Sequence, residues 1–184
     1  MTHNMNKKLR LVITAKCPNK CPMCCNNRFD LNEIPVFDRV NYEEISITGG
    51  EPLLFPYEVE KICTSIRSAA ELQGYKPKIW LYTAKLDPLT FDLIANVVDG
   101  VCYTPHSAAD VADFKGVNRH LLRNKENLSA HFLNNFSLRL NIFKPEAELL
   151  KDEDLSLWRV KPMEWIKDCP IPEGEDFRRI AKLL

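Results

Sequence analysis

Residues 9–25 read LRLVITAKCPNKCPMCC, an apolar stretch that runs directly into a group of closely spaced cysteines. Leu9–Ala15 is rich in β-branched and apolar residues and predicts a buried strand. Cys17, Cys21 and Cys24 follow it on one short loop with the spacing C-x3-C-x2-C. Soft thiolates select iron-sulfur clusters and zinc over harder metals, and each of three thiolates can hold one corner of a [4Fe-4S] cube. The fourth iron would then be open to a small molecule.

A structural zinc site is the alternative for these cysteines. Such a site normally takes four protein ligands, supplied as two paired knuckles. The sequence offers no second pair, because Cys63, Cys102 and Cys169 are isolated and Cys25 directly follows Cys24. The pattern therefore favours a cluster with three protein ligands.

A second motif follows the next predicted strand, Glu44–Thr48. It reads Gly49-Gly50-Glu51-Pro52. The two glycines permit a tight turn and let backbone groups approach a ligand without a side chain in the way, and the proline stiffens the exit. Alone, this run is equally consistent with a plain turn. Next to three cysteines in cluster spacing, it indicates a binding site.

Together, the cysteine triad and the glycine turn resemble the radical S-adenosylmethionine (radical SAM) superfamily. In that family the methionine end of SAM binds the open iron, one electron from the reduced cluster cleaves SAM, and the resulting 5'-deoxyadenosyl radical takes hydrogen from a substrate. The resemblance implies that Gly49 and Gly50 hold the SAM amino group. It makes Glu51 a carboxylate partner for that group or for a neighbouring cation, with Pro52 closing the turn.

The resemblance also selects Cys24 over Cys25 as the third ligand. Spacing alone leaves this open, because Cys25 creates a competing C-x3-C-x3-C pattern. Met23 stands where the family commonly has an aromatic residue. A flexible thioether can cover the adenine edge or pack on the cluster, so Met23 stays among the expected cofactor contacts.

Strands alternate with helices along the rest of the chain, which predicts an α/β fold with a parallel sheet. Asn26–Tyr42 holds Pro35 and no amphipathic stretch long enough for a full helix, so the first crossover is expected to be mostly loop. The resemblance implies a partial, open (β/α)6 barrel with its first helix degraded. The further strands are predicted at Lys78–Thr83, Gly100–Thr104, Ser137–Phe143 and Trp158–Pro162; the helices at Tyr57–Gln73, Leu89–Val98 and Ala108–Asn124, with a single turn at Asp152–Leu157.

Other expected contacts lie at strand ends, where side chains from several strands converge on a ligand. In the family, the middle strands contact the ribose and carboxylate of SAM, so we expect Thr83 and Asn141 there by position. His106 is either a substrate contact or proton donor, or a satisfied histidine beside a strand. Arg139 or Asn141, whichever alternates inward, could bind a carboxylate; the alternative is a solvated outer face. Lys161–Met163 close the last predicted strand.

Composition sets the frame for these predictions. The 184 residues fit a single domain, 1–184. Lysine plus arginine and aspartate plus glutamate both number 25, and the basic residues are scattered, which argues against a nucleic-acid partner. The polar start of the sequence predicts no signal peptide, and no run reaches transmembrane length. An odd number of cysteines fits a reducing compartment, so we expect a cytoplasmic protein.

The substrate is the least constrained part of the prediction. Few residues follow Trp158–Pro162, so we expect no cap over the barrel mouth and a site closed by a protein or peptide substrate or by a homodimer partner. An activating or peptide-modifying enzyme is therefore expected, with flavodoxin or ferredoxin as electron donor. The alternative enzyme resembles the 7-carboxy-7-deazaguanine synthases, which act on a small pterin. A third hypothesis is a non-catalytic iron-sulfur or SAM sensor. Cys169 lacks partners, so no auxiliary cluster is expected.

Overall fold

A computed structural model describes residues 6–21, 24–27, 29–125, 135–166 and 173–184. Its strands form one parallel sheet in the order β6-β5-β4-β3-β2-β1-β7. The chain is therefore an α/β protein, as the alternation of strands and helices predicts. The strands are β1 (Asn6–Thr14), β2 (Tyr42–Gly49), β3 (Lys78–Thr83), β4 (Gly100–Tyr103), β5 (Ser137–Phe143), β6 (Arg159–Met163) and β7 (Glu175–Arg179).

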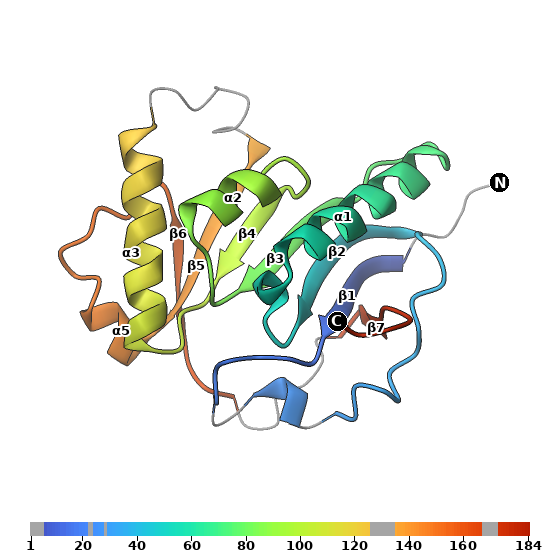
Figure 1. The fold of residues 1–184 in the computed structure, drawn as a ribbon, viewed down its shortest axis with the longest axis horizontal. Coiled ribbons are helices and arrows are strands. Elements are labelled where there is room, and N and C mark those ends of the chain that lie inside the picture. Colours follow the sequence, from blue (N-terminus) through green and yellow to red (C-terminus); the bar gives the residue numbers. More distant parts are fainter. Residues whose placement is uncertain (1–5, 22–23, 28, 126–134, 167–172) are drawn as a thin grey trace.

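Helices α1 (Pro56–Glu71), α2 (Pro88–Ile94) and α3 (Ala108–Arg123) cover one face of the sheet (Figure 1). Alternate strand residues point toward them, so that in β5 Leu138, Leu140 and Ile142 are buried while the residues between them are half-exposed. This period of two builds one continuous apolar core between sheet and helices.

Local signals in the sequence explain where these helices begin. Asp87 caps α2 by accepting hydrogen bonds from the Leu89 and Thr90 amides, and Pro88 takes the first position, where no amide hydrogen is needed. Ser107 caps α3 in the same way through the Asp110 amide. Each helix therefore begins at its capping residue, a short loop after the carboxyl end of the preceding strand.

The crossover from β1 to β2 differs from the others. Its described residues form a single short 3-10 helix, η1 (Cys25–Asn27), a hydrogen-bonded turn at 31–33 and irregular chain. The prediction of a first crossover without a full helix is confirmed for this part of the chain. A second 3-10 helix, η2 (Pro52–Leu54), directly follows the glycine turn.

Two predictions about the C-terminal third are wrong. A seventh strand, β7, follows β6 and pairs in parallel with β1. The expected single turn at Asp152–Leu157 is not helical, and the short helix α5 (Lys144–Glu148) lies earlier, directly after β5. None of the described helices is long and apolar enough to cross a membrane.

Candidate functional site

The carboxyl ends of the parallel strands gather the predicted site residues along one edge of the sheet, where open α/β sheets bind their ligands. The cysteine loop follows β1, and the glycine turn follows β2 (Figure 1). Thr83 is the last residue of β3, His106 lies between β4 and α3, and Asn141 lies near the end of β5.

The cysteine loop encloses a pocket of about 360 Å³. Cys17, Cys21 and Cys24 all line it, together with Ala15, Asn19, Lys20, Asn26 and Asn27. Cys17 is exposed, while Cys21 and Cys24 are half-buried, and none of the three is in a disulfide. The Cys24 amide donates to the Cys21 carbonyl at 3.3 Å, which folds the second half of the loop back on itself.

The electrostatics of the loop fit a site for a cation. Burial, followed by the neighbouring Cys24 and Cys17 thiolates, raises the pKa of Cys21 to about 11. Burial likewise raises the pKa of Cys17, and the Glu51 carboxylate adds to the effect. The thiolate is the form of cysteine that binds a metal, and the positive charge of a bound metal would offset the repulsion between the thiolates.

The donors are therefore right in kind, but they do not form a closed coordination sphere. Within the described ranges, no three His, Cys, Asp or Glu side chains stand together as a metal site. Cys25 begins η1. Met23 and Cys169 lie outside the described residues, as does the Cys25 side chain. The structure thus brings the three predicted ligands to one pocket and leaves the choice between Cys24 and Cys25 as a prediction.

The glycine turn packs against the root of the cysteine loop. The Gly50 amide donates to the Thr14 carbonyl and the Glu51 amide to the Lys16 carbonyl, both at 2.7 Å. A Cβ on Gly50 would stand 2.1 Å from the Lys16 carbonyl oxygen, and one on Gly49 would stand 2.4 Å from that of Thr14. Gly49 also has a φ of +132°, which favours glycine. The chain that comes close to these glycines is the backbone leading to Cys17.

The Glu51 side chain is buried, with an exposure of 2%, and links the turn after β2 to the end of β3. Its carboxylate accepts hydrogen bonds from the Leu53 amide at 3.0 Å, the Thr83 hydroxyl at 2.5 Å and the Ala84 amide at 2.8 Å. Burial raises the pKa of Glu51, and these hydrogen bonds oppose the rise. Two predicted site residues, Glu51 and Thr83, are thus in direct contact. Pro52 is buried and begins η2.

Asp110, in the first turn of α3, is a site residue that the sequence analysis missed. Its side chain is fully buried and pairs with the Lys85 ammonium at 2.6 Å. The other oxygen accepts from the Asn19 side chain at 3.1 Å and from the His106 amide at 2.9 Å. Burial opposes ionisation, but the hydrogen bonds from Lys85 and His106 outweigh it and lower the pKa of Asp110. A Ser-x-x-Asp pattern at 107–110 could have indicated a helix start, but not these distant contacts.

Farther along the edge lies an aromatic group. Phe143 and Trp165 stack with ring centroids 4.2 Å apart, and His106 contacts both rings. The His106 Nδ1 atom is buried without a hydrogen-bond partner, and burial lowers the pKa of this ring. His106 is therefore a neutral ring packed on aromatics.

The residues of β5 that face away from the helices have local partners. The Asn141 amide donates to the Cys102 sulfur at 3.0 Å and to the Thr104 hydroxyl at 3.4 Å. The Arg139 guanidinium lies 3.7 Å from the centre of the Trp80 ring. Arg139 and Asn141 are two residues apart on one strand, so they share the face of the sheet opposite α1, α2 and α3, and the expectation that only one of them faces inward is wrong.

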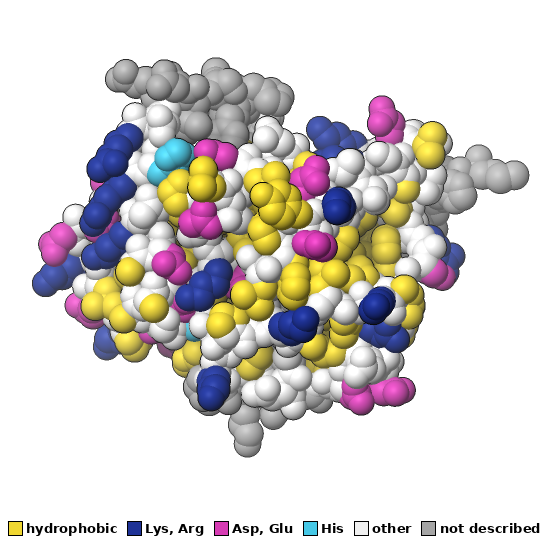
Figure 2. Space-filling model, viewed as in Figure 1, with side chains coloured by type: hydrophobic (Ala, Val, Ile, Leu, Met, Phe, Trp, Pro, Cys, Tyr) yellow, Lys and Arg dark blue, Asp and Glu magenta, His cyan; other side chains and the backbone are white. Residues whose placement is uncertain are grey.

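Charges on the opposite, helix-covered face are mixed. Figure 2 shows acidic and basic side chains interspersed there, without one large patch of a single sign. Several are paired, including Lys115 and Arg119 of α3 with Glu153.

Comparison with known proteins leaves the site to be judged from its own residues. No family model matches the chain, and no curated protein matches it either.

Proposed function

We propose that this chain is a radical SAM enzyme. One observation carries the proposal: two motifs that are well separated in the sequence meet at the carboxyl edge of a parallel sheet. The three cysteines of C-x3-C-x2-C line a single pocket, and the backbone just before Cys17 is hydrogen-bonded to the Gly-Gly-Glu-Pro turn. Because β1 and β2 are neighbouring parallel strands, the segments that follow them meet at one edge, and the cysteine spacing beside the glycine turn is what favours a SAM site over a zinc knuckle or a plain turn.

The strand order supports the same proposal. Strands β1 to β6 lie side by side in chain order, each parallel to the next, which is the arrangement that a partial (β/α)6 barrel requires. The described part of the first crossover carries the cysteine loop and a short 3-10 helix in place of a full helix. In this proposal β7 is an addition outside the six-stranded unit.

Each residue then has a defined task. Cys17, Cys21 and Cys24 would hold three irons of a [4Fe-4S] cluster, which when bound supplies the electron that cleaves SAM. The glycine turn would receive the amino-acid end of SAM, and Glu51 holds this turn against Thr83 and Ala84. Asn141 presents an amide on the face of the sheet opposite α1, α2 and α3. The rings of His106, Phe143 and Trp165 would limit the access of water to the radical.

The partners follow from this chemistry. A flavodoxin or ferredoxin in the cytoplasm would deliver the electron, and a protein or peptide would be the substrate. Exposed apolar side chains at the same edge support a macromolecular substrate: Trp165 and Ile166, which follow β6, are 38% and 61% exposed. A small pterin, as in the 7-carboxy-7-deazaguanine synthases, remains the alternative.

Anaerobic reconstitution tests the proposal. Protein loaded with iron and sulfide should turn brown, and with dithionite and SAM it should release 5'-deoxyadenosine. Alanine at Cys17, Cys21 or Cys24 should remove the colour and the product, while Cys63→Ala, in the buried face of α1, is the matched control that keeps both. A brown protein that leaves SAM intact would point to the sensor instead.

The same assay distinguishes the remaining alternatives. Loss of the cluster in Cys25→Ala with retention in Cys24→Ala would reverse the choice of third ligand. Deuterium transfer from labelled 6-carboxytetrahydropterin into 5'-deoxyadenosine would indicate that the substrate is the pterin and not a macromolecule.

A further inference from the structure

We infer that Asp110 is a positioning residue for the cysteine loop and that it acts through Asn19. The inference rests on the proposed function for its meaning, because a positioned loop matters most if the loop binds a cluster. The contact itself joins two parts of the chain that lie 91 residues apart.

The loop between Cys17 and Cys21 has few attachments of its own. Cys17, Pro18 and Lys20 are exposed, and Asn19 between them is half-buried. The Asn19 side-chain amide donates to the Asp110 carboxylate at 3.1 Å. This is the side-chain hydrogen bond by which the described residues of this segment reach the helical layer.

Asp110 is itself held from several directions. Its carboxylate pairs with Lys85, which follows β3, and accepts from the His106 amide, which follows β4. The Tyr103 hydroxyl donates to the Asp110 carbonyl at 2.8 Å, and the Asp110 amide donates to the Ser107 hydroxyl at 3.2 Å. These partners hold the fully buried carboxylate in one conformation. The loop is thereby aligned with the ends of β3 and β4.

The residue types suit this task. A neutral amide at position 19 can donate to the Asp110 carboxylate without adding charge to the cysteine loop. Lys85 pairs with the buried carboxylate of Asp110 and offsets part of its charge. A ligand-bearing loop whose supporting contacts are fixed loses less freedom when it binds.

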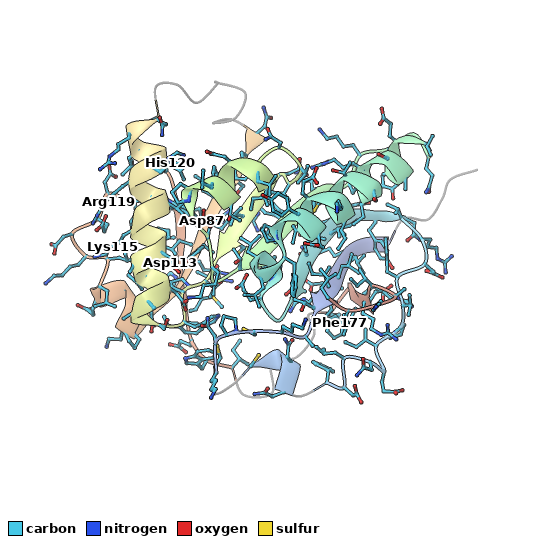
Figure 3. The ribbon with its side chains drawn as sticks, in the orientation of Figure 1. Asp87, Asp113, Lys115, Arg119, His120 and Phe177 are labelled. Atoms are coloured by element: carbon cyan, nitrogen blue, oxygen red, sulfur yellow. The ribbon has the colours of Figure 1, made fainter. Side chains whose placement is uncertain are left out.

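Site-resolved alkylation of the metal-free full-length chain tests the inference without any cluster. Iodoacetamide and mass spectrometry would give a separate rate for each cysteine. In Asn19→Ala, Cys17 and Cys21 should react about fivefold faster, the factor that corresponds to the loss of about 1 kcal/mol. Asp110→Asn should act in the same direction, and there the loss of a negative charge near both thiols adds to the rate. Asp113→Asn is the matched control: Asp113 lies one turn along α3 (Figure 3), is 3.5 Å from Lys85 and has a half-exposed side chain.

Cys63 and Cys102 are buried and serve as internal controls for general opening of the fold. Faster reaction at Cys17 and Cys21 alone supports the inference. Unchanged rates in Asn19→Ala, or equal acceleration at all cysteines in that variant, overturn it. Should Asp110→Asn fail to fold, Asn19→Ala is the deciding variant, because it leaves the buried ion pair between Asp110 and Lys85 intact.

Retention of iron by the reconstituted protein tests whether the contact between Asn19 and Asp110 also affects the proposed cluster. In reconstituted protein, a chelator should bleach the brown colour of Asn19→Ala faster than that of wild type and of Asp113→Asn. If wild-type protein takes up no iron while the alkylation pattern holds, the proposed function fails and the positioning role stands. If the cluster forms and the loop cysteines react alike in all variants, the positioning role fails and the proposed function stands.

Discussion

The two halves of the site are built in opposite ways. The glycine turn is held by backbone hydrogen bonds, lacks space for a Cβ and is closed by a buried carboxylate with three donors. The cysteine loop is mostly exposed, and its middle depends on the side chain of Asn19. Folding of the sheet therefore fixes the turn, whereas a few side chains align the loop.

This difference predicts where mutations act. Changes in the turn should cost folding stability first, and any loss of ligand binding should follow from that. Changes in the loop should leave the free energy of unfolding nearly intact and impair metal binding instead.

Gly50→Val should have the largest effect. Its Cβ would stand 2.1 Å from the Lys16 carbonyl oxygen, so the backbone before Cys17 must move. We expect a loss of about 3 kcal/mol or more in the free energy of unfolding, measured by urea denaturation, together with loss of the cluster. Gly116→Ala, where a Cβ meets nothing within 4 Å, should be neutral or stabilising. A Gly50→Val protein of wild-type stability would show that the turn is not fixed by this contact.

Glu51→Gln should lower the free energy of unfolding by about 1–3 kcal/mol near pH 4.5. The amide nitrogen that replaces one carboxyl oxygen cannot accept a hydrogen bond, so one of the donors from Leu53, Thr83 and Ala84 loses its acceptor. Burial raises the pKa of Glu51 in the folded state, so this carboxyl stabilises the fold most below its usual pKa, and the contribution is lost as the pH rises through the raised pKa. The difference between wild type and variant should therefore shrink toward neutral pH. A difference that grows with pH would mean that the pKa is lowered.

Asn19→Ala should reduce stability by only about 1 kcal/mol, since one partly exposed hydrogen bond to a charged group is removed. Thermal unfolding of the metal-free protein measures this. Combined with Asp110→Asn in a double-mutant cycle, the two effects should be clearly less than additive. Strict additivity would indicate that the two residues act independently.

Cys17→Ala should have almost no effect on the metal-free fold, within about 0.5 kcal/mol, because Cys17 is exposed. The same substitution should abolish cluster assembly. This separation of stability from metal binding is the sharpest contrast with Gly50→Val. A large destabilisation of the metal-free chain by Cys17→Ala would erase the distinction between loop and turn.

Strand positions were predictable where the apolar period is clear. The strands predicted at Lys78–Thr83 and Ser137–Phe143 match β3 and β5 to the residue. Strand β7 escaped prediction because Glu175–Arg179 reads as a charged segment with a single aromatic residue. Its charges are paired in the structure, as Arg10 with Glu175 at 2.9 Å.

The site was predictable only where its motifs are local. The cysteines and the glycine turn are short patterns, and the sequence indicated both. The role of Asp110 was not visible, because its partners Asn19 and Lys85 come from other loops. The stacking of Arg139 on Trp80 was missed for the same reason: the two residues lie on β5 and β3 and meet across the intervening strand β4.

The position of β7 beside β1 has a consequence for how the protein is made. Ile180 and Leu184 donate amide hydrogen bonds to Val12 and Ile13, and the Thr14 hydroxyl donates to the Leu184 carbonyl. The Arg10 and Glu175 side chains, which pair across the same two strands, are 165 residues apart, so the ribosome releases one partner long before the other. Chains fold from the N-terminus during synthesis, and closing so long a loop is slow. The outer edge of β1, the strand that leads to the cysteines, is therefore covered only after β7 has been synthesised.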